Sequence, residues 1–299
     1  MSSIHGLLKA MHDVGVLGAG RLGRAASILD RMFHDDGCLT YLALSGPLVP
    51  GGLRKLISYL VARQYVDVII TSGANIVHDL IEAYGGSHYR VPPRSTDITL
   101  RHSGMGRIGD IFVPQEAFET LEKQVYSFLD DLTPEERAGG LAPSEFLLRL
   151  GETLDDSTSI LKQAAVNHVP VFSPGLMDSM LGFHLFTYST TSRISLDFVK
   201  DLRILAEIVQ SSERTGAIIL GGGLSKHFAM GSTILRGGLD MAIQITLDRP
   251  EGGSLSGAPL EEGISWQKLQ EGSMFETVIG DATILFPLLV LGVIGGESQ

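Results

Sequence analysis

Short apolar runs alternate with amphipathic stretches along most of the chain. The apolar runs have the length and the aliphatic composition of strands that are buried on both faces of a sheet. They cover residues 38–44, 66–71, 169–173, 216–220 and 241–247. Between them, apolar residues recur at helical spacing, as at Leu53, Ile57 and Leu60. This repeated order of strand and helix predicts an α/β fold, with a mostly parallel sheet and helices on both faces.

No internal repeat or linker interrupts this order. We therefore expect a single domain over residues 1–299, with residues 1–35 as an N-terminal segment that leads into it. The longest apolar run, residues 284–294, is too short to span a bilayer and predicts a buried C-terminal helix. Residues 85–106 are rich in Gly, Pro, Ser and Arg and predict a long loop, which would gate a site or form an interface.

Composition narrows the class of protein. A formal net charge of −11 argues against a nucleic-acid partner. The single cysteine, Cys38, excludes a disulfide framework and fits a reducing compartment. The histidines show no metal-ligand spacing, so we expect no metal site. The first 17 residues lack the features of a signal peptide, and we expect a cytoplasmic protein that binds no membrane.

The segment from Gly18 through Gly20 to Gly23 matches the G-x-G-x-x-G motif of dinucleotide-binding proteins. That motif requires a preceding strand, and the polar pair His12 and Asp13 interrupts the apolar run too early for one. We favour a helix from about residue 21 to residue 33 instead. Its apolar face would carry Leu22, Ala25, Ile28, Leu29 and Met32.

Glycines and small polar residues follow four of the predicted strands. These turns are Thr71-Ser72-Gly73, Ser173-Pro174 with Asp178 beyond, Gly221-Gly222-Gly223 and the loop after Leu247. Because ligands of open α/β sheets bind outside the carboxyl ends of the strands, we expect the four turns to converge on one edge. The triple glycine would let the backbone approach a pyrophosphate at the start of the next helix. It is equally compatible with a tight turn that binds nothing.

Residues 261–268 hold the only Trp of the chain, Trp266, together with Glu261, Glu262 and Lys268. A lysine two residues from a large aromatic ring can lie against an apolar wall. Desolvation there lowers the lysine pKa and leaves a nucleophilic amine for imine chemistry. A lone W-x-K is also typical of a loop with a solvated lysine. The upstream triple glycine and His227 favour the reactive lysine.

Five runs of the sequence resemble deoxyhypusine synthase and its relatives. They are IILGGGLSKH, SGA followed by SW-x-K, GDATILFPLLV, VPVFSPGLMDSMLG and DVIITSGANIVHDLIEA. The similarity covers roughly residues 16–291, with the runs in the family's order. It implies a Rossmann-like NAD-binding fold of the deoxyhypusine synthase type. It also implies a homotetramer with NAD sites at subunit interfaces.

The resemblance further implies a transferase of the hypusine route. Such an enzyme uses NAD to oxidise spermidine, releases diaminopropane and passes a 4-aminobutyl group through a lysine imine to an acceptor amine. The acceptor is a lysine of a translation factor or, in the related homospermidine synthases, putrescine. Position by position, Lys268 resembles the imine-forming lysine, His227 the base, Glu262 the carboxylate that holds the polyamine and Trp266 the aromatic wall. The positions that resemble cofactor contacts are Gly221, Gly222, Gly223, Thr71, Ser72, Gly73, Asp178, Ser256, Asp281 and Ala282.

Several positions depart from the family's pattern. Phe183 and Leu255 stand where characterised members have acids, and His78 or Val77 lies nearest to a further glutamate of the family. Losing carboxylates would weaken the binding of a cationic chain. Three alternatives therefore stay open beside spermidine-dependent transfer to a protein lysine. They are an altered substrate (putrescine as the acceptor or a different polyamine as the donor), a non-catalytic NAD-binding relative, and an NAD-dependent amine dehydrogenase.

Overall fold

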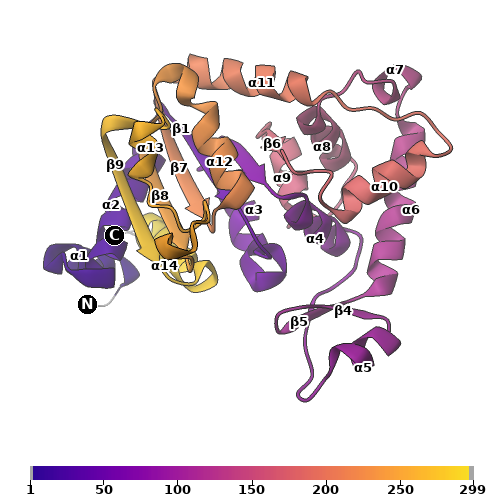
Figure 1. Ribbon diagram of the computed structural model, residues 1–299, viewed down its shortest axis with the longest axis horizontal. Coiled ribbons are helices and arrows are strands. Elements are labelled where there is room, and N and C mark those ends of the chain that lie inside the picture. Colours follow the sequence, from indigo (N-terminus) through magenta and orange to yellow (C-terminus); the bar gives the residue numbers. More distant parts are fainter. Residues whose placement is uncertain (1–2, 296–299) are drawn as a thin grey trace. The chain divides into compact units, whose positions relative to one another are not determined.

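The computed structural model describes residues 3–295, which group into two compact units (Figure 1). Unit 1 comprises the described residues of Met1–Ser45, Arg63–Ile70 and Leu202–Gln299. Unit 2 comprises Gly46–Ala62 and Thr71–Asp201. The prediction of a single domain over the whole chain stays a prediction.

Unit 1 is built on a parallel sheet. Its strands are β1 (Cys38–Leu44), β2 (Val68–Thr71, whose last residue belongs to unit 2), β7 (Arg214–Leu220), β8 (Leu239–Thr246) and β9 (Leu269–Ile279). They lie in the order β2-β1-β7-β8-β9, and the pairs β1–β7, β7–β8 and β8–β9 are parallel. This confirms the predicted parallel sheet. Strand β9 was not predicted, because it lies at the edge and most of its residues are exposed, as Glu271 and Gly272 are, or half-buried.

Helices cover both faces of this sheet. A Cβ added to Gly216 of β7 would lie 2.9 Å from Cγ of Met32 in α2 (Leu17–His34). The preceding residue, Thr215, accepts a hydrogen bond of 3.0 Å from Arg236, which follows α12 (Gly223–Ser232). Since successive residues of a strand face opposite sides, α2 and the α12 segment cover opposite faces. The predicted arrangement of helices on both faces is therefore confirmed.

The N-terminal helix α1 (Ile4–Val14) packs against α2 and against α14 (Ala282–Ile294), the predicted C-terminal helix. The glycines of the G-x-G-x-x-G segment make this packing possible. A Cβ on Gly20 would lie 2.2 Å from the carbonyl carbon of Gly15, and one on Gly23 would lie 2.3 Å from the amide nitrogen of His12. These glycines of the motif thus allow the close packing of α1 on α2. The helix begins at Leu17, earlier than expected.

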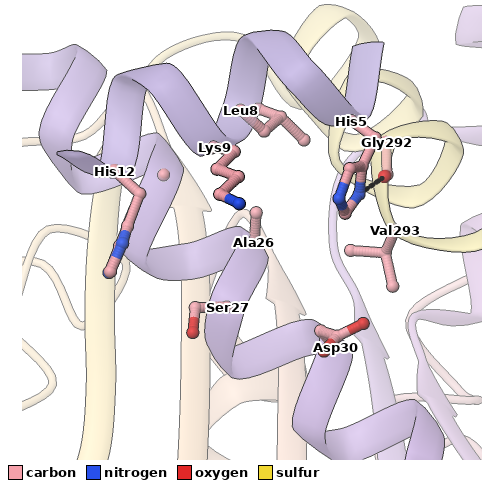
Figure 2. A pocket seen from close by; sticks show the side chains of 10 residues that line it. His5, Leu8, Lys9, His12, Ala26, Ser27, Asp30, Gly292 and Val293 are labelled. Atoms are coloured by element: carbon pink, nitrogen blue, oxygen red, sulfur yellow. Dashed lines mark hydrogen bonds between the residues drawn. The ribbon is translucent and has the colours of Figure 1, made fainter. Parts of the chain in front are cut away.

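A cavity of about 190 Å³ lies between these helices (Figure 2). Figure 2 shows Lys9 of α1 reaching toward Ala26 of α2, with Ser27 and Asp30 further along α2. His5 donates a hydrogen bond of 3.0 Å from Nδ1 to the carbonyl oxygen of Gly292. This bond joins the first and last helices of the described chain.

Unit 2 is mainly helical. Its longer helices are α3 (Arg54–Ala62, after the η1 turn Val49–Leu53), α4 (Gly73–Ala83), α6 (Gln115–Asp131), α8 (Pro143–Glu152), α9 (Ile160–Val166) and α10 (Met180–Ser189). The short strand β6 (Val171–Phe172) precedes the turn into α10. The short helix α7 (Pro134–Arg137) has Thr133 as its N-cap, whose side chain forms a capping box with Glu136. Helix α11 (Phe198–Ser211) begins in unit 2 and ends in unit 1.

The prediction of a long loop over residues 85–106 is wrong. The segment contains β3 (Tyr89–Arg90), helix α5 (Asp97–His102) and β4 (Met105–Ile108). Together with β5 (Ile111–Pro114), the two strands form an antiparallel sheet in the order β3-β5-β4. Most residues of these strands are exposed or half-buried, so the apolar pattern that reveals a core strand is missing.

Among residues 3–295, no helix combines the length and the apolar character that crossing a membrane requires.

Candidate active site

A cavity of about 310 Å³ in unit 1 brings together four residues that the sequence singled out. Lys268, His227, Glu262 and Trp266 all line it, and so do Lys226 and Leu255. His227 comes from the first turns of α12, while Glu262 begins the short helix α13 (Glu262–Ser265). Lys268 directly precedes β9, and its carbonyl oxygen accepts a hydrogen bond of 3.1 Å from Leu239 at the start of β8. The crossover from β8 to β9 must return to the amino end of the sheet, and it thereby carries Lys268 past α12.

The backbone before Lys268 turns sharply. Gln267 has a φ of +57°, and the Lys268 amide donates a hydrogen bond of 2.8 Å to the carbonyl oxygen of Gly263. The Lys268 Nζ atom lies 5.8 Å from the centroid of the Trp266 ring. The ring thus lies beside the lysine, and its role as an aromatic wall stays a prediction. The Trp266 side of the cavity is open, because this residue is 68% exposed.

The second lysine of the cavity, Lys226, was not predicted from the sequence. It is only 2% exposed. Its Nζ donates hydrogen bonds to Oε1 of Gln244 (2.9 Å) and to the carbonyl oxygens of Leu255 (3.2 Å) and Ala258 (2.6 Å). Burial lowers the pKa of Lys226 to about 8, and the negative charge of Glu262 opposes this shift. The sequence indicated the burial of Lys226 only weakly. Lys226 stands four residues before the apolar Met230, so the two share the buried side of α12.

The two lysines are therefore chemically different. An ammonium group has three N–H donors, and Lys226 uses all three on acceptors of the protein. Its nitrogen has no lone pair to offer while it remains so bound. The Lys268 Nζ makes no hydrogen bond or ion pair with the described part of the chain, and it lies beside the Trp266 ring. Of the two, Lys268 is the amine that is free to react.

The triple glycine forms a tight turn at the carboxyl end of β7. Gly221 and Gly223 have φ values of +81° and +58°, which favour glycine. A Cβ on Gly222 would lie 2.3 Å from Cα of Ser256, so the loop after β8 packs directly on this turn. The Gln244 amide joins the same two segments, donating hydrogen bonds to the carbonyl oxygens of Gly221 (2.9 Å) and Ser256 (2.8 Å).

Space for a ligand remains beside the turn. A Cβ on Gly223 would meet no atom of the described chain within 4 Å. The next residues open α12, whose first amides point toward the same end of the helix. An open glycine at a helix N-terminus suits an anionic group such as a pyrophosphate. This part of the chain therefore fits the cofactor that the resemblance implies.

Other predicted cofactor residues lie at the same edge of the sheet in unit 1. The Ser256 hydroxyl donates a hydrogen bond to the carboxylate of Asp248, which follows β8. The Gly280 amide, at the end of β9, donates to the carbonyl oxygen of Thr246 (2.9 Å). Asp281 and Ala282 come next, and Asp281 accepts a hydrogen bond of 2.8 Å from the amide of Thr283 as the N-cap of α14. The carboxyl ends of β7, β8 and β9 thus present these residues together.

The remaining predicted cofactor residues, Thr71, Ser72, Gly73 and Asp178, belong to unit 2. A Cβ on Gly73 would lie 2.6 Å from Cβ of Ser179, so the start of α4 packs against the turn that carries Asp178. The hydroxyls of Ser72 and Ser173 are buried and have no hydrogen-bond partner in the described chain. Buried polar groups normally have partners, so a bound polar group would satisfy these hydroxyls. The convergence of these turns with those of unit 1 stays a prediction.

The sequence singled out two positions, Phe183 and Leu255, that lack an acid which the resemblance leads one to expect. Leu255 lines the cavity with its side chain, while its carbonyl oxygen accepts from Lys226. Phe183 lies exposed on α10 in unit 2, with its ring centroid 6.0 Å from that of Phe186. The cavity around Lys268 consequently offers Glu262 as its carboxylate and presents an apolar side chain at Leu255.

Known proteins resemble this chain over almost its full length. The family model described as "DS: Deoxyhypusine synthase" matches residues 6–293. The "Probable deoxyhypusine synthase" of Methanothermobacter thermautotrophicus is 47% identical over 291 residues, which cover 96% of this chain and 93% of that protein. A protein of the same name in Methanopyrus kandleri is 47% identical over 290 residues, covering 97% and 93%. The crystal structure of "a putative deoxyhypusine synthase from Entamoeba histolytica" shares the fold, with a TM-score of 0.67 and 22% identity over 93% of this chain and 88% of that chain.

Proposed function

The chain belongs to the deoxyhypusine synthase family, and we propose that it transfers a 4-aminobutyl group from spermidine, or a related polyamine, to an acceptor amine with NAD as the redox cofactor. One observation carries the proposal. Lys268, His227, Glu262 and Trp266 line one cavity, and Lys268 is the lysine there whose Nζ no protein acceptor occupies.

The proposed chemistry divides between the cofactor and the chain. NAD held at the glycine turn would supply the redox chemistry, accepting a hydride from the carbon beside the secondary amine of the donor and giving it back at the end of the reaction. His227 takes the amine proton, which leaves a C=N bond in the donor. The Lys268 amine adds to this carbon, and the bond to the diaminopropane nitrogen breaks. The acceptor amine then adds to the lysine imine and frees Lys268, and the new C=N bond is reduced.

The side chains around Lys268 suit a polyamine. Glu262 supplies a negative charge for an ammonium group, and the Trp266 ring supplies an apolar surface for the methylene groups and a π face for a cation. Lys226 places a positive charge behind Leu255, which disfavours a second ammonium group at that end. We therefore propose that the cavity holds the aminobutyl part of the donor, with its terminal ammonium near Glu262.

We assign the cofactor to the glycine turn at residues 221–223, together with Ser256, Asp281 and Ala282. Thr71, Ser72, Gly73 and Asp178 are proposed contacts that rest on the resemblance, and the unpartnered Ser72 hydroxyl supports the assignment. The resemblance likewise implies a homotetramer with NAD sites at subunit interfaces. Exposed apolar side chains of unit 1, among them Leu224 and Leu247, are compatible with such contacts. Light scattering with and without NAD would measure the assembly.

The substitution Lys268→Ala tests the mechanism. We expect aminobutyl transfer to fall at least about 10³-fold, because no other lysine of the cavity has a free amine. Release of 1,3-diaminopropane should persist at a low level, because hydride removal does not require Lys268 and water can add to the resulting C=N bond in its place. The measurement is product analysis by mass spectrometry after incubation with NAD, spermidine and one acceptor. The two acceptors to compare are a lysine-bearing translation-factor domain and putrescine.

A matched control is Lys55→Ala, which removes an exposed lysine of unit 2 and should leave transfer unchanged. Full transfer by the Lys268→Ala variant would refute the lysine imine. Homospermidine as the product would identify putrescine as the acceptor, and accumulation of free NADH without transfer would identify an amine dehydrogenase.

A further inference from the structure

Two buried side chains, Lys226 and Gln244, link segments of unit 1 that the proposed mechanism uses separately. Gln244 lies on β8 and is fully buried. Its amide nitrogen donates to the carbonyl oxygens of Gly221 (2.9 Å) in the glycine turn and Ser256 (2.8 Å) in the loop after β8. Its Oε1 atom accepts a hydrogen bond of 2.9 Å from Nζ of Lys226 on α12. A flipped amide would turn its NH₂ group toward the Lys226 ammonium, so Lys226 fixes the orientation of Gln244.

The loop segment 255–258 contributes to two sites at once. Leu255 and Ala258 line the cavity of the candidate active site, and their carbonyl oxygens accept the other two hydrogen bonds of Lys226, at 3.2 and 2.6 Å. Ser256 lies between them and is a proposed cofactor contact. It packs on the glycine turn, where a Cβ added to the middle glycine would lie 2.3 Å from Cα of Ser256. A shift of this segment would therefore disturb both the cavity wall and the cofactor contact.

The same lysine holds the helical turn that carries the proposed base, His227. The preceding residue, Ser225, is buried, and its hydroxyl donates a hydrogen bond of 2.7 Å to the carbonyl oxygen of Leu44 at the end of β1. Lys226 then ties the next position of the helix to β8 and to the loop after it. Successive helical side chains point about 100° apart. The two buried anchors therefore set the direction in which His227, which is exposed and lines the cavity, points.

The three acceptors of Lys226 require a charged lysine. An ammonium group has three N–H donors, whereas a neutral amine has two and a lone pair, which would face one of the three oxygens. Burial lowers the pKa of Lys226 to about 8, and the negative charge of Glu262 opposes this shift. The ionisable groups that line the cavity with Lys226 are Glu262 of α13, His227 of its own helix and Lys268 beside β9. Strand β8 and the loop after it face the Lys226 nitrogen with the neutral amide and the two carbonyl oxygens.

We propose that Lys226 and Gln244 are positioning residues that hold the glycine turn, the loop at Ser256 and the base His227 in one fixed arrangement. This rests on the proposed function, which assigns the glycine turn and Ser256 to NAD and His227 to the amine. The pair acts through other residues, because its polar atoms are occupied by each other and by the backbone. Charged Lys226 holds the loop in place. Neutral Lys226 gives up one contact and loosens the loop.

The first test measures NAD binding to the wild-type protein by titration calorimetry, without any amine substrate. The affinity should fall about tenfold between about pH 7 and pH 9, because at pH 9 only about a tenth of the molecules keep the Lys226 proton. Glu262→Gln should move this fall to lower pH, because it removes the negative charge that favours the protonated lysine. A wild-type affinity that stayed constant over this range would overturn the proposal, even where a variant folds poorly.

Variants separate Lys226 from other groups that titrate. Lys226→Met and Gln244→Leu should each weaken NAD binding about tenfold at neutral pH, and Lys226→Met should also abolish the fall with pH. The double variant should bind NAD about as well as the weaker single variant, because the two residues act as one unit. The matched controls are Lys9→Met, an exposed lysine on α1, and Gln270→Leu, whose amide donates to a backbone carbonyl at the amino end of β9. Unchanged NAD binding in Lys226→Met would contradict the positioning role.

Hydrogen exchange measured by mass spectrometry tests the pair without any ligand. At neutral pH, Lys226→Met should raise exchange in the peptides that cover residues 221–224 and 254–260, whereas Lys9→Met should not. Exchange that stayed at the wild-type level in both segments would overturn the positioning role. If the wild type bound no NAD at all, the proposed function would fail, and the exchange of these two segments would still decide whether Lys226 holds them.

Discussion

Each unit buries a long cationic side chain, and the two are held in opposite ways. In unit 1, Lys226 donates to two carbonyl oxygens and the amide oxygen of Gln244. In unit 2, Arg54 pairs with the carboxylates of Asp79 and Asp156, at 2.7 and 2.8 Å. Their burial is similar, at 2% and 5% exposure. The difference lies in the partners, which are neutral in one unit and charged in the other.

This difference moves the two pKa values in opposite directions. Burial lowers the pKa of Lys226 to about 8. Burial acts on Arg54 in the same sense, but the carboxylates of Asp79 and Asp156 outweigh it and raise the pKa of Arg54 above its ordinary value. Neutral acceptors therefore leave a cation that can titrate near the pH of amine chemistry, whereas carboxylates fix the charge. In unit 1, Lys226 is therefore a tunable cation beside Lys268, because its charge can change with pH. In unit 2, Arg54 is a permanent cation, and its ion pairs organise the helices.

The largest expected effect comes from breaking the permanent pair. Arg54→Met should lower the free energy of unfolding by about 3–5 kcal/mol, because Asp79 would remain buried without its countercharge. Urea denaturation measures the loss. The double variant Arg54→Met, Asp79→Asn should recover part of it. A loss near zero for the single variant would show that the Arg54 pair does not organise unit 2.

A smaller loss of stability is expected at the tunable cation. Lys226→Met removes three hydrogen bonds and leaves the carbonyls of Leu255 and Ala258 without their donor. We expect a destabilisation of about 2–3 kcal/mol in the same assay. Lys268→Met should cost much less, because its Nζ has no such bonds. Equal losses for the two variants would contradict the distinction between the lysines.

The smallest effect is a pH dependence confined to the tunable cation. Between pH 8 and 10.5 the unfolded chain keeps the Lys226 proton while the folded chain releases it, so folded stability rises with pH in this window. The Lys226 contribution is about 1–3 kcal/mol. It is read as the difference between wild type and Lys226→Met in urea denaturation below and above the window. A difference that stays constant with pH would show that Lys226 does not titrate there.

Much of the fold could be predicted from local patterns. Strands β1, β7 and β8 are almost wholly buried, so their sequences are mostly apolar. Strand β9 and the small sheet β3-β5-β4 escaped prediction, because partial exposure mixes polar and apolar residues without a clear period. The residues of the candidate site could likewise be predicted only where the local sequence is distinctive. Lys268 and His227 stand in distinctive local runs. Lys226 stands in the same run as His227, but only its spacing to Met230 indicates, weakly, that it is buried.

Periodicity and turn chemistry are properties of neighbouring residues, and they were enough to specify the central strands, most of the helices and the glycine turn at residues 221–223. The roles that depend on partners far away in the sequence could be seen only in the folded chain. Lys226 is buried because its acceptors come from residues 18, 29 and 32 positions away. Gly20 and Gly23 are required because α1 presses against α2. Burial and close packing arise only when separate segments meet, so no local pattern could have distinguished the anchored lysine from the free one.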